Sequence, residues 1–294
     1  MAYETILYET NDRIAVITLN RPDKYNTIRP PMPDEIDQAI GCANNDREVR
    51  VILLQGAGTS FCGGFDFSDG LKQFEVYGIS ADPEQYDPGL DMMTSLNPHA
   101  GPTQRFMSIW RSSKPVVVKV QGWCVGGGSE YALLGDIVIA ADDARFGTPY
   151  SRVWGCHLTG IWIYRLGLTR AKHYALTGES ISGKEAAEVG LINFSYPQGQ
   201  LDTEVWDYAR KLAQIPVTQL AAMKFVTNQV FERMGLEHTA QIGPILDGIM
   251  RNTPEAREFV RTAKEQGVGA AIAKRDGPFG DYSQGDASKK PKIY

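Results

Sequence analysis

Four short runs of apolar, β-branched residues alternate with segments of helical character, and this alternation limits the folds open to the chain. The runs are RIAVITLN (13–20), VRVILLQG (49–56), VVVKVQG (116–122) and DIVIAAD (136–142). A helix is expected from about Pro33, because a proline and two acidic residues favour a helix N-terminus there, and another over about 127–134. Since strands that alternate with helices tend to pair in parallel, the sequence predicts an α/β fold.

The sequence predicts a core over residues 1–204 and a C-terminal helical region over residues 205–294. From Ile161 onward the apolar residues follow helical spacing, with glycine and proline between the segments. No Ser/Gly linker separates the two parts, so the helical region is expected to pack on the core. Residues 78–103 contain four prolines. A long segment of this kind is typical of a lid or pocket wall, or of a mobile surface loop.

Composition favours a globular protein with a substantial core, because 43% of the residues are hydrophobic and 22% are charged. The net charge of −5 and the dispersed basic residues argue against nucleic acid or a membrane surface as a partner. The four cysteines form no CxxC pair, and neither a signal peptide nor an apolar run of about 18 residues is evident. We therefore expect a cytoplasmic protein with reduced thiols. The four histidines have no metal-ligand spacing, so no metal is expected.

Two glycine-rich turns follow neighbouring runs: AGTSFCGGFDF (57–67) and GWCVGGGSEYALLGD (122–136). Both could expose backbone N–H groups at one edge of the sheet, and the second opens a helix with a positive N-terminal dipole. Two N–H donors aimed at one point form an oxyanion hole, and glycine lets a carbonyl approach the backbone to about 3 Å. The alternative is a pair of ordinary strand-to-helix turns, and spacing alone does not distinguish the two interpretations.

Several motifs resemble those of the crotonase (enoyl-CoA hydratase/isomerase) superfamily in order and spacing, over nearly the whole chain. They are the two turns, ARFGTPY (144–150), the stretch 164–193 and AIAKRDGPF (271–279). The resemblance implies a spiral of ββα units with a C-terminal helical region that assembles trimers or dimers of trimers. It also implies an acyl-CoA thioester substrate, with CoA as part of the substrate and no separate cofactor.

By position, the resemblance places the oxyanion-hole donors at the amides of Phe65 and Gly127, where they would stabilise an enolate. Glu130 matches the first of two catalytic glutamates, and we expect it to act as acid and base. Tyr150 stands where the second glutamate is expected. A tyrosine is a poor base near neutral pH but a competent hydrogen-bond donor, so Tyr150 is expected to orient the substrate. Without the resemblance, Glu130 would read as a carboxylate at a helix N-terminus.

The segment after Tyr150 also departs from the family's glycine-rich pattern. His157 is a candidate second acid/base, or a histidine hydrogen-bonded within the pocket wall. Trp154 and Trp162 suggest a shaped acyl group, cyclic or aromatic. The remaining candidates for substrate binding are Lys24, expected near a CoA phosphate, Asn26 of the same turn, and Asp66, which is also suited to bonding turn amides.

The expected activity is hydration or isomerisation of a 2-enoyl-CoA, as in fatty acid metabolism. Two alternatives stay open. One is a C–C bond hydrolase or decarboxylase that acts on a β-keto or β-diketone substrate on the same fold. The other is a non-catalytic acyl-CoA-binding scaffold, against which the intact glycine-rich turns argue.

Overall fold

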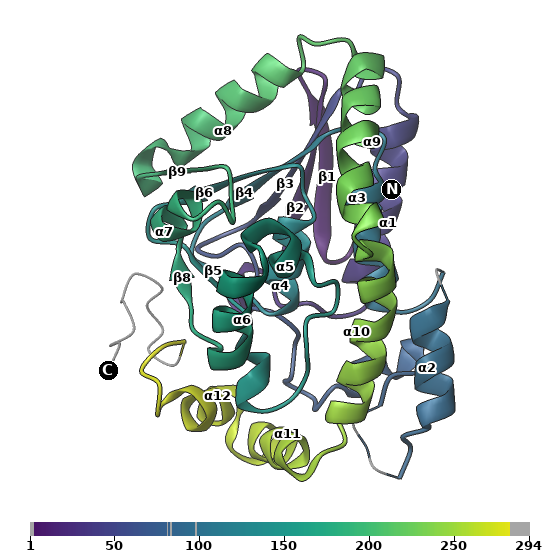
Figure 1. Ribbon diagram of the computed structural model, residues 1–294, viewed down its shortest axis with the longest axis vertical. Coiled ribbons are helices and arrows are strands. Elements are labelled where there is room, and N and C mark those ends of the chain that lie inside the picture. The colour runs from purple at the N-terminus through teal and green to yellow at the C-terminus, as the bar shows by residue number, and fades with distance from the viewer. Residues whose placement is uncertain (1–2, 81, 83, 98, 283–294) are drawn as a thin grey trace.

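The computed structural model describes residues 3–80, 82, 84–97 and 99–282, and its elements are labelled in Figure 1. The larger sheet has the strand order β1-β2-β3-β4-β6-β9. Its strands are β1 (Ile6–Asn11), β2 (Ile14–Leu19), β3 (Val51–Gly56), β4 (Val116–Val120), β6 (Ile137–Ala141) and β9 (Phe194–Tyr196). β1 and β2 form an antiparallel hairpin, and all the other neighbours pair in parallel. The four predicted runs therefore form adjacent parallel strands, which confirms the expected α/β class.

A second, three-stranded sheet has the order β5-β7-β8. Its strands are β5 (Trp123–Val125), β7 (Arg145–Gly147) and β8 (Ile181–Ser182). A bridge between Cys62 and Cys124 also joins the first glycine-rich turn to β5. These strands were not predicted, because two or three residues are too few to show a period of two along the chain.

Helices cover both sheets. They are α1 (Met32–Asn45), α2 (Pro88–Leu96), α3 (Pro102–Arg111), α4 (Gly127–Leu133), α5 (Ile161–Leu166), α6 (Leu168–Thr177), α7 (Gly183–Glu188), α8 (Gln198–Leu212), α9 (Val217–Arg233), α10 (Leu236–Met250), α11 (Pro254–Gln266) and α12 (Val268–Asp276). Short 3₁₀ turns are η1 (Pro22–Lys24), η2 (Lys72–Tyr77) and η3 (Pro149–Arg152). Over the described part of the chain, no helix has the length and hydrophobicity needed to cross a bilayer.

The segment 78–103 contains a helix that its turn-rich sequence did not predict. Asp87 caps α2 by accepting hydrogen bonds from the amides of Gly89 and Leu90, and Pro88 occupies its first turn. Pro88 and Pro102 therefore start helices here. α2 packs beside α10 (Figure 1), so the segment is built into the wall of the molecule.

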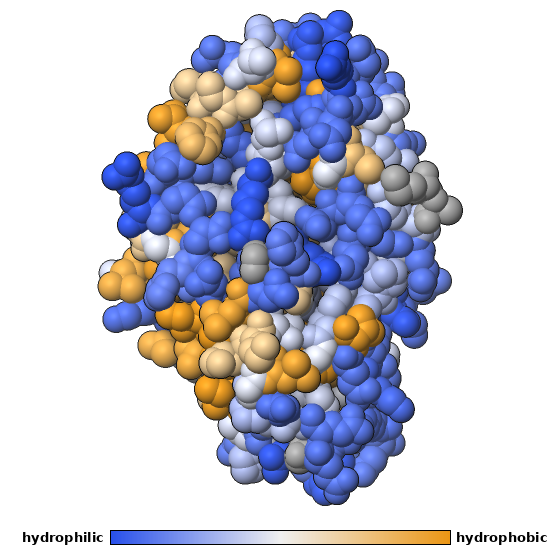
Figure 2. All heavy atoms as spheres, turned by 90° about the vertical axis from the view of Figure 1, so that its right-hand side faces the viewer, coloured by the Kyte–Doolittle hydropathy of each residue, from blue (hydrophilic) through white to orange (hydrophobic). Residues whose placement is uncertain are grey.

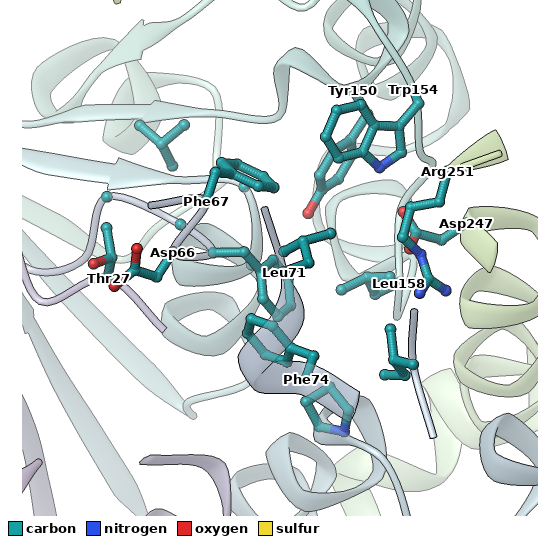
Figure 3. A pocket seen from close by; sticks show the side chains of 18 of the residues that line it. Thr27, Asp66, Phe67, Leu71, Phe74, Tyr150, Trp154, Leu158, Asp247 and Arg251 are labelled. Atoms are coloured by element: carbon teal, nitrogen blue, oxygen red, sulfur yellow. The ribbon is translucent and has the colours of Figure 1, made fainter. Parts of the chain in front are cut away.

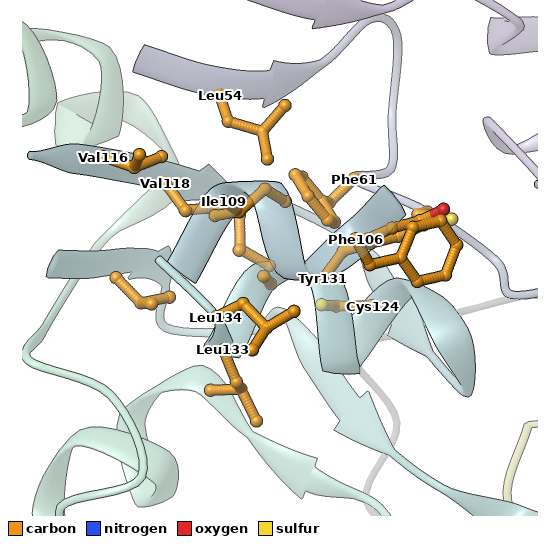
Figure 4. Close-up of a cluster of buried hydrophobic side chains, with 14 of the residues drawn as sticks. Leu54, Phe61, Phe106, Ile109, Val116, Val118, Cys124, Tyr131, Leu133 and Leu134 are labelled. Atoms are coloured by element: carbon orange, nitrogen blue, oxygen red, sulfur yellow. The ribbon is translucent and has the colours of Figure 1, made fainter. Parts of the chain in front are cut away.

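The core lies between the larger sheet and the helices that follow its strands. Figure 4 shows Leu54, Val116 and Val118 of the sheet facing Ile109 of α3 and the apolar residues of α4. Every residue of α4 is buried. A short helix held on all sides by close packing cannot shift without opening voids, so it gives the glycine triplet at its N-terminus a rigid support.

Candidate active site

The two glycine-rich turns meet at the mouth of α4. The Cβ of a residue at position 126 would stand 3.9 Å from the Cα of Gly64, and one at position 64 would stand 3.0 Å from the carbonyl oxygen of Val125. Gly64 and Gly126 also have φ angles of +94° and +56°, a conformation that favours glycine. The close approach and the backbone conformation together account for the glycines at these two positions.

Two backbone donors stand side by side at this junction. The Gly64 carbonyl and the Asp66 amide both bond to Ile28, so the amide of Phe65 between them points to the other side. Gly127 is the first residue of α4, where an amide has no intrahelical acceptor. Neither the Phe65 nor the Gly127 amide donates to any acceptor among the described residues. Both residues line the same cavity.

This cavity has a volume of about 590 Å³, which is ample for a small-molecule ligand. Aromatic side chains form much of its wall (Figure 3). They are Tyr25, Phe65, Phe67, Phe74, Trp123, Tyr150, Trp154 and Tyr282. Ile79, α2 and residues 100–104 contribute a second side, and α10 and α12 contribute a third. The glycine-rich junction is thus one end of an enclosed, mainly apolar space.

Glu130 lies behind the cavity wall and is fully buried. One carboxylate oxygen accepts hydrogen bonds from the Leu158 amide at 2.7 Å and the Tyr150 hydroxyl at 3.3 Å. The other accepts from the Thr159 amide at 2.6 Å and the Thr159 hydroxyl at 2.5 Å. These four donors occupy the lone-pair positions of both oxygens. Glu130 therefore reaches the cavity through Tyr150.

Tyr150 carries its hydroxyl into the cavity from η3 (Figure 3). Burial raises the pKa of Tyr150 well above the ordinary tyrosine value, and the Glu130 and Asp247 carboxylates act in the same direction. The phenol is thus held protonated, with its hydrogen bond directed at Glu130. A protonated hydroxyl in this position can pass a proton between the cavity and Glu130.

Three predicted site residues besides Glu130 lie outside the cavity lining, and their positions do not support direct contact with a substrate. Trp162 is fully buried and donates from Nε1 to the Ser129 hydroxyl. Asn26 is also fully buried, and its amide bridges the turn carbonyls of Ala57 and Ser60. The ring of His157 stands edge-on to the Tyr150 ring, and both of its nitrogens are buried without a partner among the described residues. Sequence patterns show that a residue is near a site but not which way its side chain points.

Three other predicted residues do line the cavity, namely Lys24, Asp66 and Trp154. Lys24 is exposed at the mouth, where an anionic group could reach it. Burial would raise the pKa of Asp66, but hydrogen bonds from Ser68 and the Arg21 guanidinium outweigh it and lower the pKa. Asp66 therefore serves chiefly to fix the first glycine-rich turn. Within the described residues, no group of three or more His, Cys, Asp or Glu is arranged to hold a metal ion.

Sequence reasoning missed a charged cluster in the cavity wall that consists of Asp91 of α2, Asp247 of α10 and Arg251 just after α10. The Arg251 guanidinium contacts the Asp91 carboxylate at 3.2 Å and the Asp247 carboxylate at 3.1 Å. The available signal was the Asp–Arg pair at positions i and i+4 in LDGIMR, but such pairs are common on solvent-facing helices. Nothing local indicated that this one faces inward.

Comparisons with known proteins show which family the chain is similar to. The family model described as Enoyl-CoA hydratase/isomerase matches residues 9–250. A crystal structure of an enoyl-CoA hydratase from Mycobacterium smegmatis superposes with a TM-score of 0.88 at 38% identity, covering 98% of both chains. A probable enoyl-CoA hydratase of Rhodobacter capsulatus is 34% identical over 76% of this chain and 81% of its own length. A hydroxycinnamoyl-CoA hydratase-lyase of Pseudomonas fluorescens is 29% identical over 76% of this chain and 75% of its own.

Proposed function

The chain belongs to the enoyl-CoA hydratase/isomerase family, and on that premise we propose that it hydrates or isomerises a 2-enoyl-CoA thioester. The observation that carries the proposal is the pair of amides, Phe65 and Gly127, that lack an acceptor among the described residues and lie at the junction of the two glycine-rich turns. A carbonyl oxygen between two such donors gains most when it becomes an enolate oxyanion, because the donors are already oriented by the fold.

The proposed hydration uses these donors at its first step. Water adds to Cβ of the 2-enoyl group, the double-bond electrons move to the thioester, and the enolate oxygen is stabilised by the Phe65 and Gly127 amides. The enolate then collapses as Cα takes up a proton, which gives a 3-hydroxyacyl-CoA. A single oxyanion-hole donor contributes on the order of 10²–10³ in rate in other enzymes, so two donors supply a large part of the catalysis.

We propose that Glu130 acts as acid and base through Tyr150. As water attacks, its proton passes to the Tyr150 hydroxyl oxygen while the phenolic proton moves to Glu130 along the 3.3 Å hydrogen bond. The reverse transfer delivers the proton to Cα, so the enzyme ends in its starting state. The raised pKa of Tyr150 fits this role, because the phenol relays a proton without accumulating as a phenolate.

The aromatic wall favours a cyclic or aromatic acyl group over a plain alkyl chain. Phe67 and Trp154 stand in T-shaped contact, with ring centroids 5.4 Å apart, beside the cavity, and such faces suit a planar ring. The similarity to a hydroxycinnamoyl-CoA hydratase-lyase supports this choice. It also makes cleavage of a C–C bond after hydration a second candidate outcome, and product analysis separates the two.

We propose that Lys24 binds a phosphate of CoA at the mouth of the cavity, with Arg275 of α12 nearby on the same lining. Lys24 makes no ion pair within the described residues, so it is available to an anion. The adenosine end of CoA would then remain outside, and its binding energy would hold the thioester at the two amides.

We further propose that the chain assembles as a homotrimer or a dimer of trimers. α9 has 17 residues, and Lys224 is the only buried one. Figure 2 shows apolar residues gathered on the face that includes α10 and α2. The exposed apolar side chains are Leu90, Met92, Met93 and Leu96 of α2, Met223, Phe225, Val226 and Val230 of α9, and Ile242, Leu246, Ile249 and Met250 of α10. A group of large exposed apolar side chains of this kind is typical of a protein interface.

The test of the proposed function follows the loss of enoyl absorbance for short, long and aryl 2-enoyl-CoA substrates, with products identified by mass. Tyr150→Phe should lower kcat by about 10²–10⁴-fold, because it removes the relay and keeps the ring. Tyr208→Phe, which lies on α8 away from the cavity, is the matched control. Hydration at the same rate by wild type and Tyr150→Phe would refute the relay. Absence of turnover with every enoyl-CoA would refute the function.

A further inference from the structure

The charged cluster of Asp91, Arg251 and Asp247 is built into a mainly apolar cavity and is not used by the proposed hydration. Asp91 and Arg251 are almost fully buried, at 3% and 5% exposure. The Asp247 side chain is 21% exposed, and it lies on the cavity lining (Figure 3). Buried charges are retained where their partners hold them in place, and this cluster is held by residues from two separate helices.

Two polar atoms of the cluster have no hydrogen-bond partner among the described residues, namely Asp247 Oδ1 and Arg251 Nη1. Arg251 donates from Nε to Asp247 Oδ2 at 3.1 Å, and from Nη2 to both oxygens of Asp91 at 3.2 Å. Asp247 Oδ1 accepts no hydrogen bond from any described residue. The guanidinium therefore fixes the orientation of the Asp247 carboxylate and leaves its second oxygen for a donor in the cavity.

Two glycines make room for this arrangement. The Cβ of a residue at position 248 would lie 1.7 Å from an Asp91 oxygen, so only glycine lets α2 bring its carboxylate against α10. The Cβ of a residue at position 155 would lie 2.9 Å from Asp247 Oδ1. Backbone on one side and Arg251 on the other thus confine the carboxylate of Asp247.

The position of Asp247 relative to Tyr150 shows which part of a substrate it faces. The Tyr150 hydroxyl and Cε1 lie 3.8 Å from where a Cβ at position 126 would stand, next to the proposed oxyanion site. The opposite end of the same ring, at Cδ1 and Cγ, lies 3.3 Å and 3.6 Å from a Cβ at position 155, beside Asp247 Oδ1. Asp247 is therefore separated from the thioester end of the cavity by the length of the Tyr150 ring.

We propose that Asp247 selects acyl groups that carry a hydroxyl on the part of the chain or ring remote from the thioester; this rests on the proposed function for the placement of the thioester. The hydroxyl donates to Asp247 Oδ1. An acyl group without a donor there leaves a desolvated carboxylate oxygen unpaired, which is the basis of strong discrimination between a hydroxylated ligand and its analogue.

The charges of the cluster favour a neutral donor over a charged one. Two carboxylates face one guanidinium, so a carboxylate on the acyl group would meet repulsion. Burial raises the pKa of Asp247, against the opposing effect of Arg251. A neutral hydroxyl pairs with the Asp247 carboxylate without bringing a second charge into the apolar cavity.

The test compares binding of matched saturated acyl-CoA ligands by calorimetry, since these have no double bond to hydrate. The pairs are 3-(4-hydroxyphenyl)propanoyl-CoA against 3-phenylpropanoyl-CoA, and 8-hydroxyoctanoyl-CoA against octanoyl-CoA. We expect the wild type to bind the hydroxylated member of at least one pair about tenfold more tightly or better. Equal affinity within both pairs would overturn the proposal, as would tighter binding of 8-aminooctanoyl-CoA than of the hydroxylated ligand.

Variants test whether Asp247 causes the preference for the hydroxylated ligand. Asp247→Leu should reduce the affinity ratio to about one or invert it. Asp247→Asn keeps the volume and the acceptor for Arg251, and it should lower the ratio because it turns an amide donor toward the cavity. Glu237→Gln, on the exposed face of the same helix, is the matched control and should keep the wild-type ratio. A ratio that survives in both Asp247 variants would overturn the assignment.

The proposed function and this selectivity fail in different ways. Absence of turnover with all enoyl-CoA substrates, together with the expected binding ratio, would refute hydration and support the role of Asp247. Turnover without a binding preference would refute the role of Asp247 alone.

Discussion

Replacement of Glu130 by glutamine should destabilise the protein whether or not Glu130 takes part in catalysis. The carboxylate accepts four hydrogen bonds, two from the backbone amides of Leu158 and Thr159 and two from the hydroxyls of Tyr150 and Thr159. Glutamine turns one of the accepting oxygens into an NH₂ donor. The hydroxyls can rotate to accept from it, but a backbone amide cannot, so one of the two amides is left facing a donor.

The expected loss of stability follows from the number of hydrogen bonds that the substitution disturbs. A buried donor without an acceptor costs about 1–3 kcal/mol, and the loss of the negative charge weakens the remaining bonds. We therefore expect Glu130→Gln to lower the free energy of unfolding by about 2–4 kcal/mol. Urea unfolding at matched protein concentration measures this as a lower midpoint with an unchanged slope.

The control is Glu237→Gln, where an exposed ion pair with Arg111 is lost and a change of under about 1 kcal/mol is expected. If Glu130→Gln also changed stability by less than about 0.5 kcal/mol, the described anchoring of the carboxylate would be wrong. Activity of the variant is then interpretable only at a temperature where unfolding curves show it to be folded.

Three further outcomes are expected. Gly248→Ala places a Cβ 1.7 Å from an Asp91 oxygen and should lower the free energy of unfolding by about 1–3 kcal/mol. In an Asp91→Ala background the same change should cost much less. Equal costs in the two backgrounds would show that Gly248 and Asp91 are not in contact. Burial lowers the pKa of His157, although Glu130 opposes it. The contribution of His157 to the free energy of unfolding is therefore complete above the ordinary histidine pKa of about 6.5. It is lost as the pH falls toward the lower pKa of His157 in the folded protein. Urea midpoints of His157→Gln should depend less on pH between about 5 and 7, and identical pH profiles would count against this. Glutamate at Phe225 or Val230, both exposed on α9, should reduce the assembly size in sedimentation, and unchanged sedimentation would show that this face is not the interface.

The four adjacent parallel strands β2, β3, β4 and β6 and the two glycine-rich turns could be predicted because their signals are local. A run of β-branched residues favours a buried strand. The positive φ angles of Gly64 and Gly126 disfavour most other residues at these two positions. α2 was missed for the opposite reason. Pro88 and the cap residue Asp87 are also typical turn residues, and only the folded helix shows that they form its N-terminus.

The direction of the side chains depended on contacts that no local pattern contains. Trp162 and His157 follow Tyr150 closely in sequence, yet only Tyr150 lines the cavity. Glu130 is turned away from the cavity because the amides of Leu158 and Thr159, 28 and 29 residues further along the chain, donate hydrogen bonds to its carboxylate oxygens. A sequence motif can identify such a carboxylate as significant, but the position of its hydrogen-bond donors decides whether it touches a substrate.

The chain's own residue pattern is sufficient for the α/β class, the adjacent parallel strands and the two turns, since each follows from the conformational preferences of a few consecutive residues. The contents of the cavity required the folded molecule. Asp91 and Arg251 are 160 residues apart and meet where α2 packs on α10, with the Asp91 carboxylate against Gly248. Contacts between residues so far apart in the sequence depend on how whole helices pack, and this packing depends on the side chains of both helices.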